Sequence, residues 1–316
     1  MRMFFLLAIT FSIFIVSCSP EIESTTTTTT TTTIFINIDS SIPFPKEPVR
    51  LTFIHQKLGA SLLSSVNDTY GNGHLALYLN KNNYFVTDIT KGWDTDISLF
   101  IPKKKPIGNF TEIVDLIIWF NPLNEELLMN EVFLNNYEYP NNNNIKYSNI
   151  ISKPSGSNEI ILFKVTSESC EVGDSSDDEI SIYNDILKYT IKRSDKLFIF
   201  FTPPPKTQIY KAEKTRQFCN YLSDMKNGWL KDYSGNNVGV FDIYNVLTNE
   251  KNIHTANSSD DVVHFVDESS DNVLSSKYSS VEDKEMVNND GLIKVTQNFI
   301  PLLNYYYNRW KNIKYK

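Results

Sequence analysis

Apolar runs that alternate with amphipathic segments are the feature that most restricts the fold of this chain. The run EIILFKV (159–165) is apolar on nearly every residue, which is typical of a strand covered on both faces. A second apolar run, KLFIFFT (196–202), ends at consecutive prolines. Between the two runs, Ile182, Ile186 and Tyr189 recur at helical spacing. Strand, helix and strand in this order predict a parallel sheet covered by helices.

The same alternation extends from residue 49 to the C-terminal region. We expect further strands at 50–55, 84–89 and within 237–247. We expect further helices at 74–82, 110–120, 124–136, 212–225 and 291–310, the last kinked or restarted at Pro301. Residues 137–154 are polar and rich in asparagine, which indicates a loop. The pattern therefore predicts an α/β fold with a mainly parallel sheet and helices on both faces.

The carboxyl ends of the predicted strands are the places to look for a binding site, because ligands of open parallel sheets bind there. The residues that follow these ends lie in 55–59, 88–96, 166–174 and 242–245. From them we expect the following residues to line a cleft: His55, Gly59, Asp88, Trp93 and Asp242.

The first 18 residues have the layout of a secretory signal peptide, with one arginine before an apolar run over 3–16. This run is shorter than the about 20 residues that a membrane-spanning helix needs. Residues 15–18 (IVSC) also resemble a bacterial lipobox, in which Cys18 would carry lipid. Ordinary cleavage near Cys18 and free secretion is the alternative. We therefore expect a secreted or cell-surface protein whose membrane contact is limited to such an anchor.

Residues 19–48 contain an unbroken threonine tract followed by several prolines. Such a segment cannot bury a core, so it is predicted to be an extended linker that can carry O-linked glycans. The folded domain is expected to span 49–316. Three N-glycosylation patterns within it, which matter only in a eukaryotic cell, begin at Asn67, Asn109 and Asn257.

Charge and residue spacing exclude several classes of partner. The net charge is -7 and no basic stripe is present, so no nucleic acid partner is expected. Acidic runs lack the spacing of a calcium loop, and His254 and His264 lie in a polar segment without zinc-ligand spacing. We expect neither a metal nor a cofactor. Cys170 and Cys219 either form a disulfide, which an oxidising compartment permits, or are two buried thiols.

Seven segments in a common order resemble the SGNH/GDSL hydrolase-like family, in particular its secreted or lipid-anchored branch. They are FIHQKLGASLL (53–63), NNYFVTDITKGWDTDI (82–97), GSNEIILFK (156–164), IYNDILKY (182–189), DKLFIFFTPPP (195–205), VFDIYNVLTN (240–249) and QNFIPLLNYYYNRW (297–310). The resemblance implies a flavodoxin-like, three-layer α/β/α sandwich with about five parallel strands. It also implies ester hydrolysis, often deacetylation of carbohydrate, by a Ser-His-Asp arrangement.

The sequence departs from the family at each catalytic position. Lys57 occupies the place of the nucleophilic serine, and Lys284 and Met286 occupy those of the aspartate and histidine. After the third predicted strand, no asparagine for the oxyanion appears until Asn184. Because a triad acts as a unit, these substitutions predict a catalytically degenerate protein that retains, at most, a carbohydrate-binding cleft.

An active carbohydrate esterase with a relocated nucleophile is the alternative. Ser61 lies one helical turn beyond position 57, and it would act with His55 or with His264 as the base. The fold alone does not decide between the two functions, because one fold supports many sites.

Overall fold

The computed structural model of the chain describes residues 41–55, 57–65, 71–89, 113–134, 147–164, 176–207, 212–259, 261–281 and 286–314. The chain divides into two units, Met1–Phe35 and Ile36–Lys316. The first unit lies wholly outside the described residues, as do Cys18, Asn67, Trp93, Asn109, Cys170 and Lys284. The signal peptide and most of the linker over 19–48 therefore stay predictions.

The centre of the second unit is a five-stranded sheet in which every neighbouring pair is parallel. Its strands lie in the order β2-β1-β3-β4-β5. Their bounds are β1 (Val49–Ile54), β2 (Tyr84–Ile89), β3 (Ile160–Lys164), β4 (Leu197–Phe201) and β5 (Val238–Phe241). Every residue of these strands is buried, as their apolar runs predict for a sheet covered on both faces. The predicted α/β fold with about five parallel strands is confirmed.

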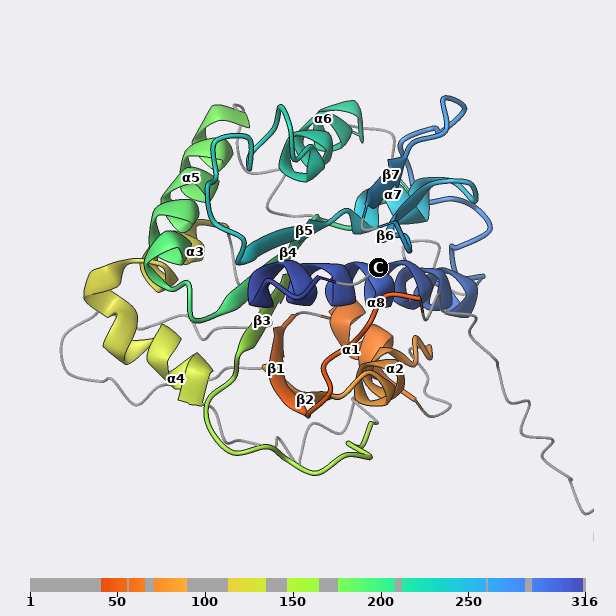
Figure 1. Ribbon diagram of the computed structural model, residues 1–316. Helices are drawn as coiled ribbons and strands as arrows, with labels where there is room; N and C mark the ends of the chain where they lie inside the picture. The colour runs from red at the N-terminus through yellow and green to blue at the C-terminus, as the bar shows by residue number, and fades with distance from the viewer. Residues whose placement is uncertain are drawn as a thin grey trace, which may run out of the picture. The chain divides into compact units, whose positions relative to one another are not determined.

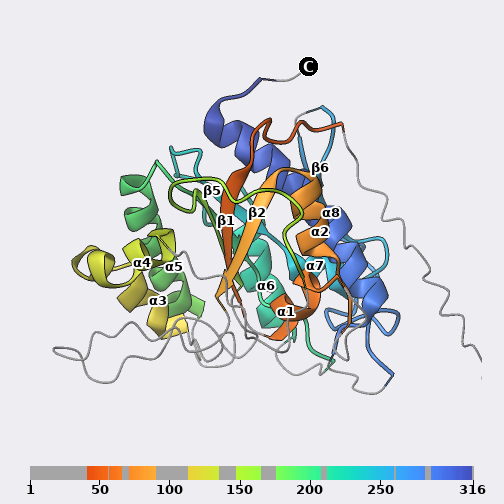
Figure 2. The same cartoon turned by 90° about the horizontal axis from the view of Figure 1, so that it is seen from below.

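Helices form a layer on each face of the sheet (Figures 1 and 2). The first face is covered by α1 (Lys57–Leu63), α2 (Leu75–Lys81), α7 (Ile243–Thr248) and α8 (Asn289–Lys311). The second face is covered by α3 (Ile113–Trp119), the 3-10 helix η1 (Pro122–Leu127), α4 (Met129–Leu134), α5 (Ser176–Lys192) and α6 (Ala212–Ser223). Each layer buries its own hydrophobic cluster against the sheet, so the molecule is an α/β/α sandwich.

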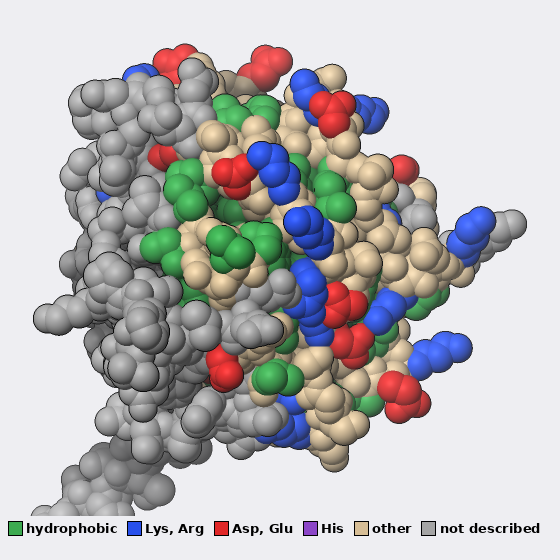
Figure 3. All heavy atoms as spheres, turned by 90° about the vertical axis from the view of Figure 1, so that its left-hand side faces the viewer, with side chains coloured by type: hydrophobic (Ala, Val, Ile, Leu, Met, Phe, Trp, Pro, Cys, Tyr) green, Lys and Arg blue, Asp and Glu red, His purple; other side chains and the backbone are tan. Residues whose placement is uncertain are grey.

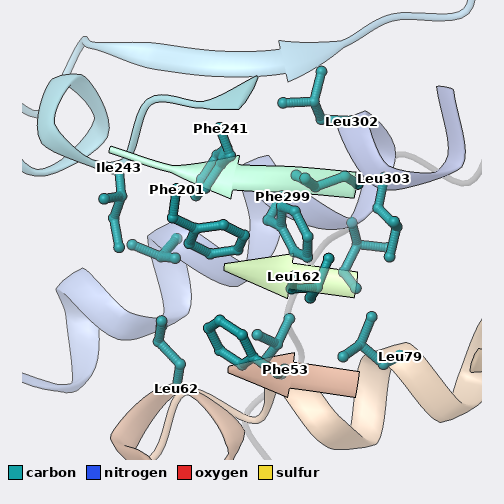
Figure 4. Close-up of a cluster of buried hydrophobic side chains, with 14 of the residues drawn as sticks. Phe53, Leu62, Leu79, Leu162, Phe201, Phe241, Ile243, Phe299, Leu302 and Leu303 are labelled. Carbon is teal, nitrogen blue, oxygen red and sulfur yellow. The ribbon is translucent and has the colours of Figure 1, made fainter. Parts of the chain in front are cut away.

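Aromatic side chains fill the first cluster where α8 crosses the sheet (Figure 4). The ring of Phe299 lies 4.7 Å from that of Phe201 and 5.1 Å from that of Phe241. Each phenylalanine that is fully buried in this way stabilises the fold by about 1.5–3 kcal/mol. Farther along the helix, the ring of Tyr306 lies directly on Gly239, where an added Cβ would approach it to 2.6 Å. A glycine in β5 therefore sets how closely α8 packs on the sheet.

Two predicted helices differ in detail from the observed ones. The helix expected at 124–136 is split into η1 and α4, and α8 continues as one helix through Pro301 rather than restarting there. Pro301 is buried, and the surrounding core holds the helix although proline supplies no N–H at that position.

A hairpin replaces part of the polar loop that the sequence predicts around His254 and His264. Strands β6 (Ile253–Ala256) and β7 (Val262–Phe265) pair antiparallel and form a separate sheet. The backbone N–H of His254 donates to Asn298 Oδ1 of α8 at 3.1 Å, so the hairpin is anchored to the helix layer. Strands this short carry too few residues for a period of two to stand out in the sequence.

The chain before β1 also contributes to the core. Ile42 is fully buried, and Asn308 Nδ2 of α8 donates to the carbonyl of Pro43 at 2.7 Å. Among the described residues, no helix combines the length and the apolar composition needed to cross a membrane.

Candidate functional site

The side chain of Asp242, at the carboxyl end of β5, is the centre of the candidate site. It is fully buried. Its Oδ1 accepts hydrogen bonds from Thr202 Oγ1 at 2.9 Å and from the backbone N–H of Asn245 at 3.0 Å. Its Oδ2 lies 2.9 Å from His264 Nε2 and accepts from Ser223 Oγ at 3.4 Å. Asp242 thus caps α7 and joins β4, α6 and the hairpin.

Asp242 is ionised at neutral pH. Burial alone would raise the pKa of this carboxyl. The hydrogen bond and charge of His264, the charge of His254 and the backbone N–H of Asn245 together hold the pKa well below its ordinary value. An ionised carboxylate is only an acceptor, which fixes the direction of every hydrogen bond it makes.

His254 lies beneath this pair and is neutral. The backbone N–H of Asp242 donates to His254 Nδ1 at 2.7 Å, so the proton of the neutral ring is on Nε2. The pKa of His254 is lowered to about 3, mainly by burial and also by the charge of His264, while the charge of Asp242 opposes this shift. Its ring stacks on Phe241, with 5.9 Å between the ring centroids. Within the described part of the chain, His254 Nε2 has no hydrogen-bond partner.

His264 is the member of the cluster that reaches solvent, with a side chain that is 25% exposed. Because Asp242 only accepts, His264 must donate through Nε2. When the ring is neutral, its Nδ1 is therefore unprotonated, and no described residue hydrogen-bonds to that atom. The rings of His254 and His264 meet edge to face, 4.8 Å apart. His264 is therefore oriented and polarised by buried groups.

A pocket of about 780 Å³ opens beside His264. It lies between the end of α6 with the following turn, strand β7 and α8. Its polar and aromatic lining residues, besides His264, are Asn220, Tyr221, Ser223, Asp224, Lys226, Asn227, Asp261 and Tyr305. Amides, carboxylates, an ammonium group and phenol rings that face one space can bind a ligand with many hydroxyl groups.

The turn that forms one wall of this pocket is held by its own side chains. Asp224 accepts hydrogen bonds from the backbone N–H groups of Lys226 at 2.9 Å and Asn227 at 3.0 Å, and these lower the pKa of its carboxyl. A Cβ added at Gly228 would lie 2.0 Å from the carbonyl oxygen of Tyr221, so the close approach there requires glycine. The wall is thus preformed.

A second imidazole–carboxylate pair lies at the same edge of the sheet, but it is closed. His55 Nε2 lies 3.4 Å from Asp88 Oδ2, and both side chains are buried. Tyr147 donates its hydroxyl to Asp88 Oδ1 at 2.7 Å. A Cβ at Gly59 would lie 2.3 Å from the His55 ring, so the backbone of α1 covers the imidazole directly. These contacts tie β1 to β2 and α1, which is a structural role.

The structure brings some of the predicted site residues together and not others. Asp242 and His264 form a pair, and so do His55 and Asp88. Ser61, in α1, is buried, and within the described residues it hydrogen-bonds to neither histidine. Lys57 begins α1, and Met286 is half-buried shortly before α8. The Ser61 arrangement is thus not assembled in the described part of the chain.

The remaining predicted residues are candidates for glycosylation or for a disulfide. Asn257 is partly buried in the β6–β7 turn, where its Oδ1 accepts from the backbone N–H groups of Ser259 and Asp261 at 2.9 Å and 3.2 Å. Cys219 is buried in α6. Because Cys170 lies outside the described residues, a disulfide between the two stays a prediction.

Another pocket, of about 280 Å³, lies between α3 and α5. Its lining is mostly apolar, and Ile117 and Ile191 on these helices are exposed. Figure 3 shows hydrophobic and basic side chains side by side on the face that carries α3, α4 and α5. Neither a histidine nor a carboxylate–imidazole pair is among the described residues that line this pocket, so the pocket beside His264 is the candidate site.

No protein-family model and no curated protein sequence matches this chain. Among solved structures, the chain is similar to the crystal structure of a predicted acylhydrolase from Bacteroides fragilis. The two are 13% identical, the match covers 86% of this chain and 92% of the other, and the TM-score is 0.44. The fold assignment here depends on the parallel sheet and its two helix layers, not on this match.

Proposed function

We propose that this protein is an extracytoplasmic, SGNH-hydrolase-like α/β/α protein that binds carbohydrate in the pocket beside His264 without hydrolysing it. The observation that carries the proposal is the lining of that pocket. Asn220 and Asn227 offer amides that both donate and accept, as sugar hydroxyl groups do. Tyr221 and Tyr305 offer rings on which the apolar face of a sugar can pack.

The residues found at the catalytic positions of the family support the absence of hydrolysis. Lys57 is the first residue of α1, two residues beyond the end of β1, where the serine is expected. An acyl-lysine is an amide, which would hydrolyse too slowly to turn over. Met286 cannot serve as a general base. The N-terminal signal peptide supports a location outside the cytoplasm, either secreted or lipid-anchored at Cys18.

Binding is tested by applying the purified protein to an array of plant and microbial glycans and titrating the strongest ligand by calorimetry. A Tyr305→Ala variant should lower the affinity by about tenfold or more, because stacking and burial on the ring are lost. Tyr78→Ala is the matched control, since both tyrosines are partly buried against the same hydrophobic cluster and Tyr78 lies outside the pocket. Retention of no glycan would contradict the proposal.

Carbohydrate ester hydrolysis is a second candidate, favoured by the Asp242–His264 pair. An imidazole oriented by a buried carboxylate is the base of many hydrolases, and Ser223 lines the same pocket. Turnover of aryl acetate or acetylated xylan above the buffer rate, abolished by both Ser223→Ala and His264→Gln, would establish it. Turnover that survives either change would exclude Ser223 and His264 as the nucleophile and base.

A further inference from the structure

We infer that His264 gives the pocket a fixed polarity: its Nδ1 accepts a hydrogen bond from a hydroxyl or N–H group of the ligand, so the pocket selects neutral, hydroxyl-rich glycans over their anionic counterparts. The inference deepens the proposed carbohydrate binding and rests on it for the identity of the ligand. The geometry on which it stands, however, belongs to the ligand-free protein.

The first step is the proton on His264 Nε2. The opposite tautomer would place a nitrogen lone pair 2.9 Å from Asp242 Oδ2. Asp242 is already anchored by the hydroxyl of Thr202 and the backbone of Asn245, so its carboxylate cannot turn away without breaking both bonds. In the neutral ring, the proton therefore lies on Nε2 toward Asp242, and Nδ1 carries the lone pair.

The second step is the position of the ring. Asn245 Nδ2 donates to the carbonyls of Ile253 at 3.1 Å and Phe265 at 2.8 Å, which fastens both hairpin strands to α7. The ring of His254 supports His264 from the side. His264 thus presents Nδ1 from a rigid support, and no described residue occupies that acceptor.

The third step concerns charge around the acceptor. Two carboxylate residues, Asp224 and Asp261, line the pocket against one cation, Lys226. An anionic group has no proton to donate to Nδ1. It would also be repelled by the lone pair on Nδ1 and by the net negative charge of the lining residues. A hydroxyl group donates to Nδ1 and meets further acceptors around it.

The tautomer is tested by nitrogen-15 NMR of the free protein, through two-bond couplings of the His264 ring. We expect an Nε2-protonated neutral ring that becomes a mixture of tautomers in Asp242→Asn, because an amide can either donate or accept. A ring protonated on Nδ1 in the unchanged protein would overturn the inference. This measurement needs no ligand, so it separates failure of the polarity from failure of the proposed function.

Selection is tested on the glycan array, by comparing neutral oligosaccharides with the same backbones that carry uronate, sulfate or phosphate. We expect the neutral members to be retained at least tenfold better, and stronger retention of the acidic members would overturn the inference. His264→Gln can keep the hydrogen bond to Asp242 while it removes the Nδ1 acceptor, and it should lower affinity by about tenfold. His264→Asn, whose amide oxygen sits near the Nδ1 position, should retain more affinity than His264→Gln. The reverse order would also contradict the inference.

Discussion

The carboxylate of Asp242 lies 2.9 Å from Nε2 of His264, although one residue follows a strand of the central sheet and the other belongs to the separate hairpin. This contact links the two sheets, together with the hydrogen bond from the backbone N–H of Asp242 to His254. His264 also lines the pocket, and its Nδ1 has no hydrogen-bond partner among the described residues. The contribution of this pair to stability and its proposed role in binding can be separated by experiment.

Replacing Asp242 with asparagine should destabilise the protein by about 3 kcal/mol, because it removes a buried charge that three donors and an imidazole satisfy. The free energy of unfolding at pH 7, measured by urea denaturation, checks this. Asp185→Asn is the matched control, since Asp185 is an exposed partner of Lys188 and should change stability by less than about 0.5 kcal/mol. Equal effects of the two changes would show that the Asp242 network contributes nothing particular.

Acid should destabilise the protein through His254. Its folded pKa of about 3 lies below the unfolded value, so the neutral ring contributes stability that is complete above about pH 6.5 and is lost as the pH falls toward 3. From pH 6.5 to 5, this group alone should cost about 2 kcal/mol. His254→Asn, whose amide can still accept from the N–H of Asp242, should show a correspondingly flatter profile. Urea denaturation at pH 7 and pH 5 measures the difference, and parallel profiles would refute the assignment.

Glu179 should destabilise the protein as the pH rises, which is the opposite of the effect of His254. It is a buried carboxyl in the first turn of α5, and its Oε1 has no hydrogen-bond partner in the described part of the chain. Burial raises its pKa to about 7, so ionisation penalises the folded state as the pH rises from about 4.5 through 7. Glu179→Gln should therefore stabilise the protein at pH 8 by about 2 kcal/mol and much less at pH 5. The exposed Glu268→Gln is the control, and a gain independent of pH would exclude ionisation as the cause.

Gly59 should tolerate no side chain while His55 is present. A Cβ there would lie 2.3 Å from the imidazole, and Gly59→Ala should cost about 1–3 kcal/mol from overpacking. In the background of His55→Ala the same substitution should cost clearly less, because the clashing ring is gone. A double-mutant cycle by thermal denaturation measures the coupling, and additive effects would mean that the two residues do not clash.

Much of the central sheet is predictable from the sequence because its strands are buried on both faces. Four consecutive apolar residues in β3 and five in β4 predict strands that are buried on both faces. The hairpin is not predictable in this way. Only alternate residues of β6 are buried, all of β7 is at least partly exposed, and each strand has four residues. Their pairing depends on α8 and on Asn245, which are distant in sequence.

The site follows the same division. The sequence identifies both residues as candidates. Asp242 follows a predicted strand, and His264 is one of the two histidines that could act as a base. The sequence does not predict the contact between them, because it forms only when the hairpin packs against the end of β5. The sequence predicts that His55 and Asp88 line a cleft, yet their side chains are buried against each other and under α1, because Gly59 lets the helix approach.

The last helix has a consequence for how this protein is made. Phe299 and Tyr306 of α8 cover β4 and β5, strands that are synthesised well before this helix. One layer of the core therefore stays open until α8, which follows every strand of the sheet in the chain, has been synthesised.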